Sequence, residues 1–282
     1  MKLAKLYVCG MGAFECWING ERVSDHVMEP GWTDFRRTCF YTAYDVSEYF
    51  AEGENTENII LVKLGDCMFN VPGGRYVYFQ RSYGKAKLLC SWSWFMKMAS
   101  REYVVTDESW KRAKSPIEFC CIYGGEDFEW KTVDKGIFNI RSVGNLGSCS
   151  VCRTPLGELK PAPMEPLRVK EIYQPVSSER SRKQGYGSMI WEKIFGWARI
   201  FLKTNGSRAG QKVVLKTAEK LDENGRIDQS VTGKDYAWTY VLNDKKEQEF
   251  VTGFYVYRVP LCGDDRCCAG KRNFFTGGIY LP

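Results

Sequence analysis

Cysteine is the residue type whose spacing in this chain could most directly hold a metal ion. Cys149 and Cys152 form a C-x-x-C pair, and Cys262, Cys267 and Cys268 form a second group near the C-terminal end. Zinc takes four ligands, mostly thiolate and imidazole, so the two groups would have to meet in space to make one site. No histidine lies beside either group. The sequence therefore leaves a zinc site open but favours free thiols.

Five further cysteines lie among apolar residues, where a reduced thiol packs like a small hydrophobic side chain. They are Cys9, Cys16, Cys39, Cys90 and Cys120. The first residues lack the apolar stretch of a secretory signal peptide. No run of about 18 apolar residues, the length that crosses a membrane, is present. We therefore expect a cytoplasmic protein without a membrane partner, whose thiols stay reduced.

The only histidine is His26. A catalytic triad needs a histidine held by a third group, and many zinc sites use histidine, so the composition argues against both chemistries. We interpret His26 as a hydrogen-bonded structural residue at a strand edge rather than as a ligand. The formal net charge of +6 is spread along the 282 residues. Without a basic cluster, no nucleic-acid partner is expected.

Apolar and polar residues alternate with a period of two, which is the pattern of half-buried β-strands. The alternation predicts strands at residues 3–8, 13–18, 41–46, 58–64, 102–106, 197–203 and 211–218. Asn19-Gly20 predicts a tight hairpin after the second strand, because a type I′ turn needs two residues with positive φ. No long amphipathic helix is expected. We predict an all-β protein made of two antiparallel β-sandwiches in tandem.

Proline marks the expected division of the chain. Pro161, Pro163 and Pro166 cluster in one short segment, and proline stiffens a chain and blocks strand pairing. We predict one sandwich at residues 1–168, a second, incomplete one at 169–260, and an unassigned cysteine-rich tail at 261–282.

Several short motifs follow one another between residues 6 and 126. They are Trp17-Ile18-Asn19-Gly20, Pro30-Gly31-Trp32-Thr33-Asp34, Leu64-Gly65-Asp66, Thr106-Asp107-Glu108-Ser109-Trp110 and Ile122-Tyr123-Gly124-Gly125-Glu126. In order and spacing they resemble the accessory N-terminal module of bacterial α-L-rhamnosidases, glycoside hydrolase family 78. A second stretch, formed by residues 175–197 and 210–228, resembles the next β-sandwich of the same enzymes, although residues 187–197 keep only the end of its motif. The whole resemblance covers about residues 3–257.

The resemblance implies lectin-like, jelly-roll sandwiches that recognise rhamnose-containing glycans. In this family, hydrolysis takes place in a large (α/α)6 barrel that follows the sandwiches and uses a pair of acidic residues. The resemblance therefore implies that the catalytic barrel is absent from this chain, so that no catalytic residue is carried over. A separate catalytic barrel becomes a candidate partner.

The same resemblance implies a carbohydrate site. Trp32 and Tyr123 are its candidates for stacking on a sugar face, since an aromatic ring offers a large apolar surface. Asp66, Asn70 and Glu126 are its candidates for binding sugar hydroxyl groups, at strand ends where loops carry function.

Calcium is the cofactor that the resemblance implies, with Asp25 and Asp34 as its candidate ligands, because calcium prefers hard oxygen atoms. Structural roles remain open for the same residues. Trp32 could plug the end of the sandwich core. Asp34 and Asp45 could cap turns, since an aspartate side chain bonds to its own backbone two residues on.

Three functions therefore remain open. The favoured one is a non-catalytic carbohydrate-binding portion of an α-L-rhamnosidase. The second is a truncated or decayed fragment of such an enzyme with a structural role. The third is a glycoside hydrolase in its own right, which needs a carboxylate pair; Asp107, Glu108 and Glu126 are the first candidates for it.

Overall fold

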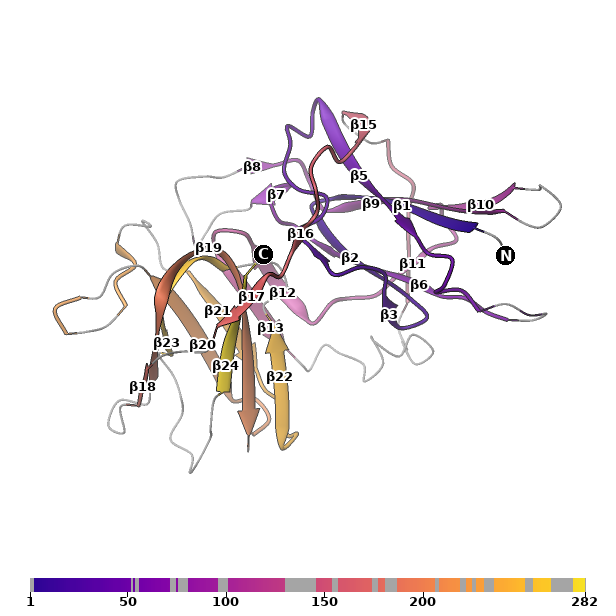
Figure 1. The fold of residues 1–282 in the computed structure, drawn as a ribbon. Coiled ribbons are helices and arrows are strands. Elements are labelled where there is room, and N and C mark those ends of the chain that lie inside the picture. The colour runs from indigo at the N-terminus through magenta and orange to yellow at the C-terminus, as the bar shows by residue number, and fades with distance from the viewer. Residues whose placement is uncertain are drawn as a thin grey trace. The chain divides into compact units, whose positions relative to one another are not determined.

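The structure is a computed structural model in which each regular element of the described residues is a β-strand (Figure 1). It describes all residues except 1–2, 52, 54–55, 72–74, 76–80, 96–100, 130–145, 154–156, 174–176, 181–186, 206–207, 219–221, 225–226, 231–235, 252–255, 265–275 and 282. The all-β prediction is confirmed. Within the described part of the chain, we find no helix that is long and apolar enough to cross a membrane.

The strands follow one another along the whole chain. Those before residue 113 are β1 (Leu3–Met11), β2 (Ala13–Ile18), β3 (Glu21–Arg22), β4 (His26–Val27), β5 (Thr38–Asp45), β6 (Ile60–Gly65), β7 (Asn70–Val71), β8 (Arg81–Ser82), β9 (Lys87–Phe95), β10 (Arg101–Val105) and β11 (Lys111–Arg112). Those after it are β12 (Ile117–Cys121), β13 (Gly125–Glu129), β14 (Gly147–Ser148), β15 (Glu158–Pro161), β16 (Leu167–Arg168), β17 (Glu171–Tyr173), β18 (Ser177–Arg180), β19 (Gly187–Asn205), β20 (Lys212–Ala218), β21 (Ala237–Val241), β22 (Glu247–Val251), β23 (Val256–Asp264) and β24 (Thr276–Leu281).

The chain folds into two compact units that are discontinuous in sequence. The first unit comprises Met1–Asn70, Tyr83–Ser115 and Val133–Leu167, and the second comprises Val71–Ser82, Pro116–Thr132 and Arg168–Pro282. Two segments that precede the predicted division at residue 168 therefore belong to the second unit. The predicted tail at 261–282 is not a separate element either, because it contributes β24 and the end of β23 to the sheet of that unit.

Two sheets of the first unit enclose its core. One is five-stranded, with the order β10-β9-β1-β5-β15, and the other is three-stranded, with the order β3-β2-β6. β1 runs antiparallel to both β5 and β9, whereas β15 joins β5 in parallel. The first unit is thus a β-sandwich.

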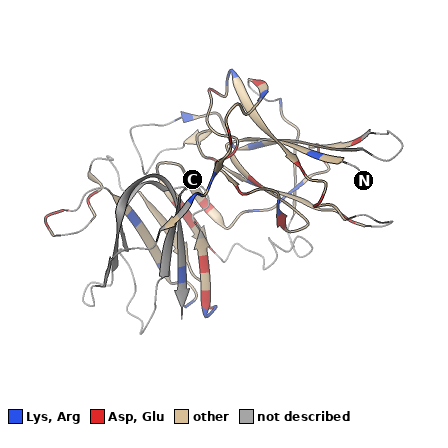
Figure 2. Cartoon of the chain, viewed as in Figure 1, with Lys and Arg blue, Asp and Glu red and all other residues tan. Residues whose placement is uncertain are grey.

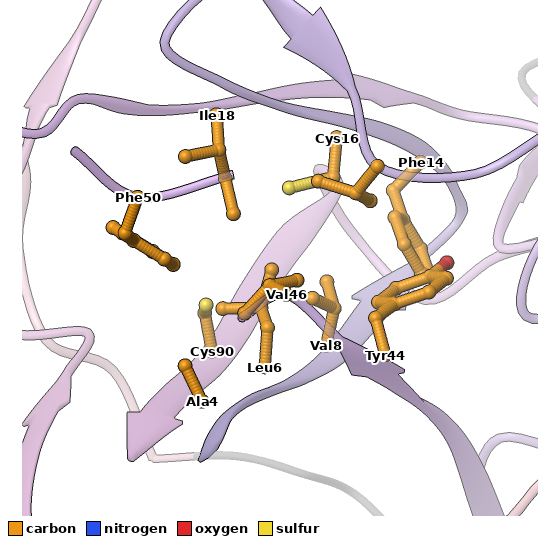
Figure 3. Close-up of a cluster of buried hydrophobic side chains, with 11 residues drawn as sticks. Ala4, Leu6, Val8, Phe14, Cys16, Ile18, Tyr44, Val46, Phe50 and Cys90 are labelled. Atoms are coloured by element: carbon orange, nitrogen blue, oxygen red, sulfur yellow. The ribbon is translucent and has the colours of Figure 1, made fainter. Parts of the chain in front are cut away.

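Period-two alternation accounts for the core of this sandwich. Ala4, Leu6 and Val8 point inward from β1 with 0% exposure, while the residues between them stay half-buried. The cluster that they join consists of Ala4, Leu6, Val8, Phe14, Cys16, Ile18, Val23, Tyr44, Val46, Phe50 and Cys90 (Figure 3). Burying each large apolar side chain stabilises the fold by about 1.5–3 kcal/mol before entropy is counted.

The predicted hairpin forms at Asn19-Gly20. Their φ angles are 52° and 89°, as a type I′ turn requires, and the turn sets Ile18 opposite Glu21. The Asn19 side chain also donates to Asn58 Oδ1 at 2.8 Å, which ties the turn to the segment before β6.

The second unit is built on one ten-stranded sheet. Its main path is β12-β13-β21-β20-β23-β19-β24-β17, and β18 and β22 pair with the long strand β19. Trp238 and Tyr240 of β21 are among its largest buried side chains, and the Tyr240 ring lies 4.8 Å from that of Phe250. The expected count of two sandwiches in tandem stays a prediction. Charged residues of both signs are spread over the described strands of both units (Figure 2).

Candidate functional site

Trp32 is an exposed aromatic side chain on the first unit. It is 58% exposed, so the alternative that it plugs the core of the sandwich is wrong. It lies in the loop between β4 and β5, and we call residues 28–34 the Trp32 loop. Exposure of a large indole to water costs hydrophobic free energy.

Hydrogen bonds hold the backbone on both sides of Trp32. Before it, the Glu29 carbonyl accepts from the Phe14 amide at 2.9 Å. After it, the Thr33 hydroxyl donates to the Thr38 carbonyl at 2.5 Å, and the Asp34 carbonyl accepts from the Thr38 amide at 2.9 Å. The indole is therefore presented from an anchored loop.

The Asp34 carboxylate is occupied by its neighbour two residues on. It accepts two bonds from the Arg36 guanidinium, both at 2.9 Å, and one from the Arg36 amide at 3.2 Å. The side-chain bond to Arg36 lowers the pKa of Asp34 to about 2. The turn-capping alternative is confirmed for Asp34, and Asp45 caps its own turn by accepting from the Ser47 amide at 3.1 Å.

The expected calcium site is not assembled by acidic side chains in the described residues. There, no group of three or more His, Cys, Asp or Glu side chains is placed to hold a metal ion. The Asp25 side chain is 69% exposed, and its Oδ1 lies 4.0 Å from His26 Nε2. Calcium binding by Asp25 and Asp34 stays a prediction.

Asp66 and Asn70 come together in one turn at the end of β6. The Asp66 carbonyl accepts from the amides of Phe69 and Asn70, both at 3.1 Å. Burial raises the pKa of the Asp66 carboxyl, and a hydrogen bond from the Asn70 side chain opposes that rise. These two predicted residues therefore form one half-buried polar pair, and their part in a sugar site stays a prediction.

Tyr123 and Glu126 belong to the second unit. Tyr123 is half-buried in the turn between β12 and β13. Glu126 is 2% exposed and sits on β13 opposite Cys120 on one side and Trp238 on the other. Its side chain is interior, so Glu126 does not stand at a surface where a sugar could reach it.

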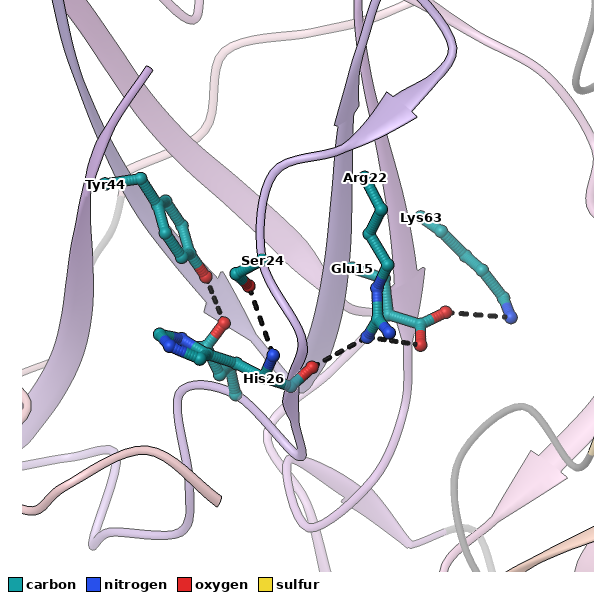
Figure 4. Close-up of polar contacts among 7 residues, drawn as sticks. Glu15, Arg22, Ser24, His26, Tyr44 and Lys63 are labelled. Atoms are coloured by element: carbon teal, nitrogen blue, oxygen red, sulfur yellow. Dashed lines mark hydrogen bonds and ion pairs between the residues drawn. The ribbon is translucent and has the colours of Figure 1, made fainter. Parts of the chain in front are cut away.

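A buried polar cluster in the first unit was only partly foreseen. His26 Nδ1 lies 2.8 Å from Glu29 Oε1, and the Tyr44 hydroxyl donates to Glu29 Oε2 (Figure 4). Glu29 is 7% exposed, and burial, followed by the charge of Glu29, raises the pKa of Tyr44. The structural interpretation of His26 is confirmed. The spacing of His26 and Glu29 was the only signal in the sequence for the other members.

A second buried carboxylate lies next to this cluster. Glu15 on β2 pairs with Arg22 at 3.0 Å and with Lys63 at 3.5 Å. Arg22 also donates to the His26 carbonyl at 2.7 Å. Figure 4 shows the two groups side by side, with Arg22 between them.

The candidate carboxylate pair of a hydrolase is not assembled within the first unit. Asp107 accepts from the Ser109 amide at 2.8 Å and from its hydroxyl at 2.5 Å, so it caps a turn. Glu108 is exposed beside it. Glu126, the third candidate, is interior to the second unit.

The cysteines are described in part. Cys9, Cys16, Cys39 and Cys90 are buried free thiols, as predicted, whereas Cys120 is only half-buried. Of the proposed zinc ligands, Cys149 is half-buried and Cys152 is exposed. Cys267 and Cys268 lie outside the described residues, and the side chain of Cys262 does too.

Comparison with known proteins gives consistent results. A family model described as alpha-L-rhamnosidase N-terminal domain matches residues 1–171. An alpha-L-rhamnosidase of Formosa agariphila is 26% identical over 230 residues, which is 79% of this chain and 23% of that protein. One of Streptomyces avermitilis is 29% identical over 267 residues, which is 89% of this chain and 24% of that protein. The chain thus spans about a quarter of the length of these relatives.

Solved structures share the fold. An alpha-L-rhamnosidase from Dictyoglumus thermophilum superposes with a TM-score of 0.83 at 24% identity, over 98% of this chain and 30% of that one. The Streptomyces avermitilis alpha-L-rhamnosidase, solved in complex with L-rhamnose, gives 0.83 at 20% identity, over 99% of this chain and 27% of that one.

Proposed function

The chain belongs to the family of alpha-L-rhamnosidase N-terminal domains, and from that premise we propose that it is a non-catalytic, carbohydrate-binding portion of an α-L-rhamnosidase. Its ligands are rhamnose-containing glycans. The described residues hold β-sheets and no helix, so this part of the chain is a scaffold for loops rather than a helical barrel.

The observation that carries the proposal is the exposed Trp32 on its anchored loop. An aromatic ring that is fixed before binding stacks on the apolar face of a sugar with little loss of conformational freedom. The Asp66–Asn70 pair supplies carboxylate and amide groups in the same unit, which suit the hydroxyl groups of a sugar. Tyr123 and calcium remain part of the proposal on resemblance alone.

Titration of the full chain with L-rhamnose tests this function. We expect a weak heat of binding at millimolar ligand, measured by calorimetry with and without calcium. Trp32→Ala is expected to weaken binding about tenfold or more, because a lost stacking contact of about 1.4 kcal/mol is a factor of ten. Tyr103→Ala is the matched control, since Tyr103 is an aromatic residue of β10 that is 69% exposed.

Two results would overturn the proposal. One is the absence of any heat with the wild-type chain, and the other is wild-type affinity in Trp32→Ala. Turnover of a chromogenic rhamnoside by the purified chain would contradict the non-catalytic assignment.

A structural role is the second candidate, and β10 supports it. This strand is the edge of the five-stranded sheet, and three consecutive residues, Tyr103, Val104 and Val105, are exposed at 69%, 42% and 44%. Exposed apolar residues on an edge strand are characteristic of a surface that another element covers. A chain that binds no sugar but whose β10 is protected from hydrogen exchange within a longer rhamnosidase would favour this role.

A further inference from the structure

We propose that Glu29 is a positioning residue for the carbohydrate site: its buried carboxylate ties the Trp32 loop to the sandwich through His26 and Tyr44, and it does so without touching the sugar. The effect of Glu29 on sugar binding rests on the proposed function. Its structural part, the control of Trp32 by Glu29, can be measured independently.

Glu29 has the burial and the partners that such a role requires. It is 7% exposed, and both carboxylate oxygens are engaged, Oε1 with His26 at 2.8 Å and Oε2 with the hydroxyl of Tyr44. Removing a hydrogen-bond donor from a buried carboxylate destabilises the folded state, because no water molecule replaces the lost bond. The cluster therefore holds one arrangement strongly.

The three residues come from different parts of the sandwich. Tyr44 belongs to β5, one of the central strands of the five-stranded sheet. His26 belongs to β4, just before the Trp32 loop, and its amide is also oriented by the Ser24 hydroxyl at 3.3 Å. The Glu29 backbone meanwhile bridges to Phe14 at the start of the three-stranded sheet. Glu29 thus joins the loop to both sheets of the first unit.

Trp32 is three residues beyond this anchor. The backbone between them includes Gly31, whose φ of 90° is in the region that favours glycine. On the far side of the loop, the Thr33 hydroxyl donates to the Thr38 carbonyl and the Asp34 carbonyl accepts from the Thr38 amide. The bonds of Glu29 therefore hold the near end of the Trp32 loop, and the bonds to Thr38 hold its far end.

Glu15 provides a matched control. It is a second buried glutamate, 9% exposed, and it pairs with Arg22 and Lys63 rather than with the loop. Glu15→Gln and Glu29→Gln make the same chemical change in neighbouring clusters. Neither substitution removes the Arg22 guanidinium or the His26 carbonyl, so we expect the bond between them to remain in both variants.

The experiment uses the full chain labelled with 5-fluorotryptophan, which gives one fluorine NMR signal for each of the 9 tryptophans. Trp32→Phe assigns the Trp32 signal. We expect Glu29→Gln to shift or broaden that signal and Glu15→Gln to leave it unchanged. If the ordered loop falls to about one fifth of the molecules, the apparent Kd for L-rhamnose rises about fivefold.

Each outcome decides the inference. A Trp32 signal and a Kd that Glu29→Gln leaves unchanged would overturn it, and so would equal effects of the two glutamate variants. If the wild-type chain binds no L-rhamnose, the proposed function fails, and the fluorine signal alone decides whether Glu29 controls Trp32. Should Glu29→Gln not fold, Tyr44→Phe removes a single donor and is expected to move the Trp32 signal in the same direction.

Discussion

Gly12 and Gly65 approach each other so closely that a Cβ atom on Gly12 would lie 2.1 Å from the Gly65 carbonyl oxygen. Gly12 stands between β1 and β2, where the chain passes from the five-stranded to the three-stranded sheet, and its φ is 125°. Gly65 ends β6 and pairs with Ala13. The corner of the sandwich therefore has no room for a side chain.

Gly12→Ala is expected to destabilise the first unit by about 2–5 kcal/mol, because the backbone strain of positive φ adds to the steric overlap. Gly20→Ala separates the backbone strain from the steric overlap. Gly20 has a φ of 89° but would meet no atom within 4 Å, so only about 1–2 kcal/mol is expected. Urea unfolding of both variants measures the difference, and equal losses would contradict the close approach.

Alkylation of the cysteines is expected to follow their burial. Burial raises the pKa of Cys9 and Cys90 to about 12, and it raises that of Cys16 as well, so that little reactive thiolate forms near neutral pH. A short iodoacetamide pulse followed by mass spectrometry should modify the exposed Cys152 before these buried thiols. Cys9, Cys16 and Cys90 should react only in concentrated urea, and their modification in the native chain would show that the sandwich opens.

Asp34 is expected to make the first unit sensitive to acid. Its carboxyl pKa falls from 3.8 to about 2 through the bond to Arg36. Because the folded pKa is the lower one, this pair stabilises the fold above the unfolded value of 3.8, and the contribution is lost as the pH falls through about 2. The urea midpoint of Asp34→Asn should lie below that of the wild type near neutral pH, and the gap should close in acid. A gap that stays constant with pH would exclude the ion pair as its cause.

Local patterns predicted the elements of the first sandwich well. Residues 13–18 were expected as a strand and form β2, and Asn19-Gly20 makes the expected hairpin, because both features depend only on neighbouring residues. The turn at Asp34 was also among the alternatives for the same reason. The exposure of Trp32 was not decided by the sequence, since the motif around it suits either a surface loop or a core plug.

Long-range pairings account for what the sequence did not predict. Val71–Ser82 belongs to the second unit, where Arg75 pairs with Asp127 and donates to the Ala237 carbonyl at 3.2 Å. No local sequence pattern predicts a hydrogen bond between residues that are 162 positions apart in the chain. Tyr44 and Glu29 are only 15 positions apart, but their contact also depends on pairing between strands, because the pairing of β5 with β1 decides which face of the sheet the tyrosine occupies.

Asp66 should respond to pH in the opposite sense to Asp34. Burial raises its carboxyl pKa above 3.8, against the opposing bond from Asn70. The folded chain then holds this proton more tightly than the unfolded chain. The contribution of Asp66 to the stability of the fold is therefore favourable below pH 3.8 and is lost as the pH rises through the folded pKa.

Asp66→Asn keeps the size of the side chain and an oxygen that accepts from Asn70, but it removes the cost of burying a charge. The variant is therefore expected to be more stable than the wild type near neutral pH and to lose that advantage in acid, as measured by urea midpoints over the same pH series as Asp34→Asn. A variant that is less stable than the wild type near neutral pH would show that the ionised carboxylate has a partner stronger than Asn70, and the pair would then have to be reconsidered as a cation or sugar contact.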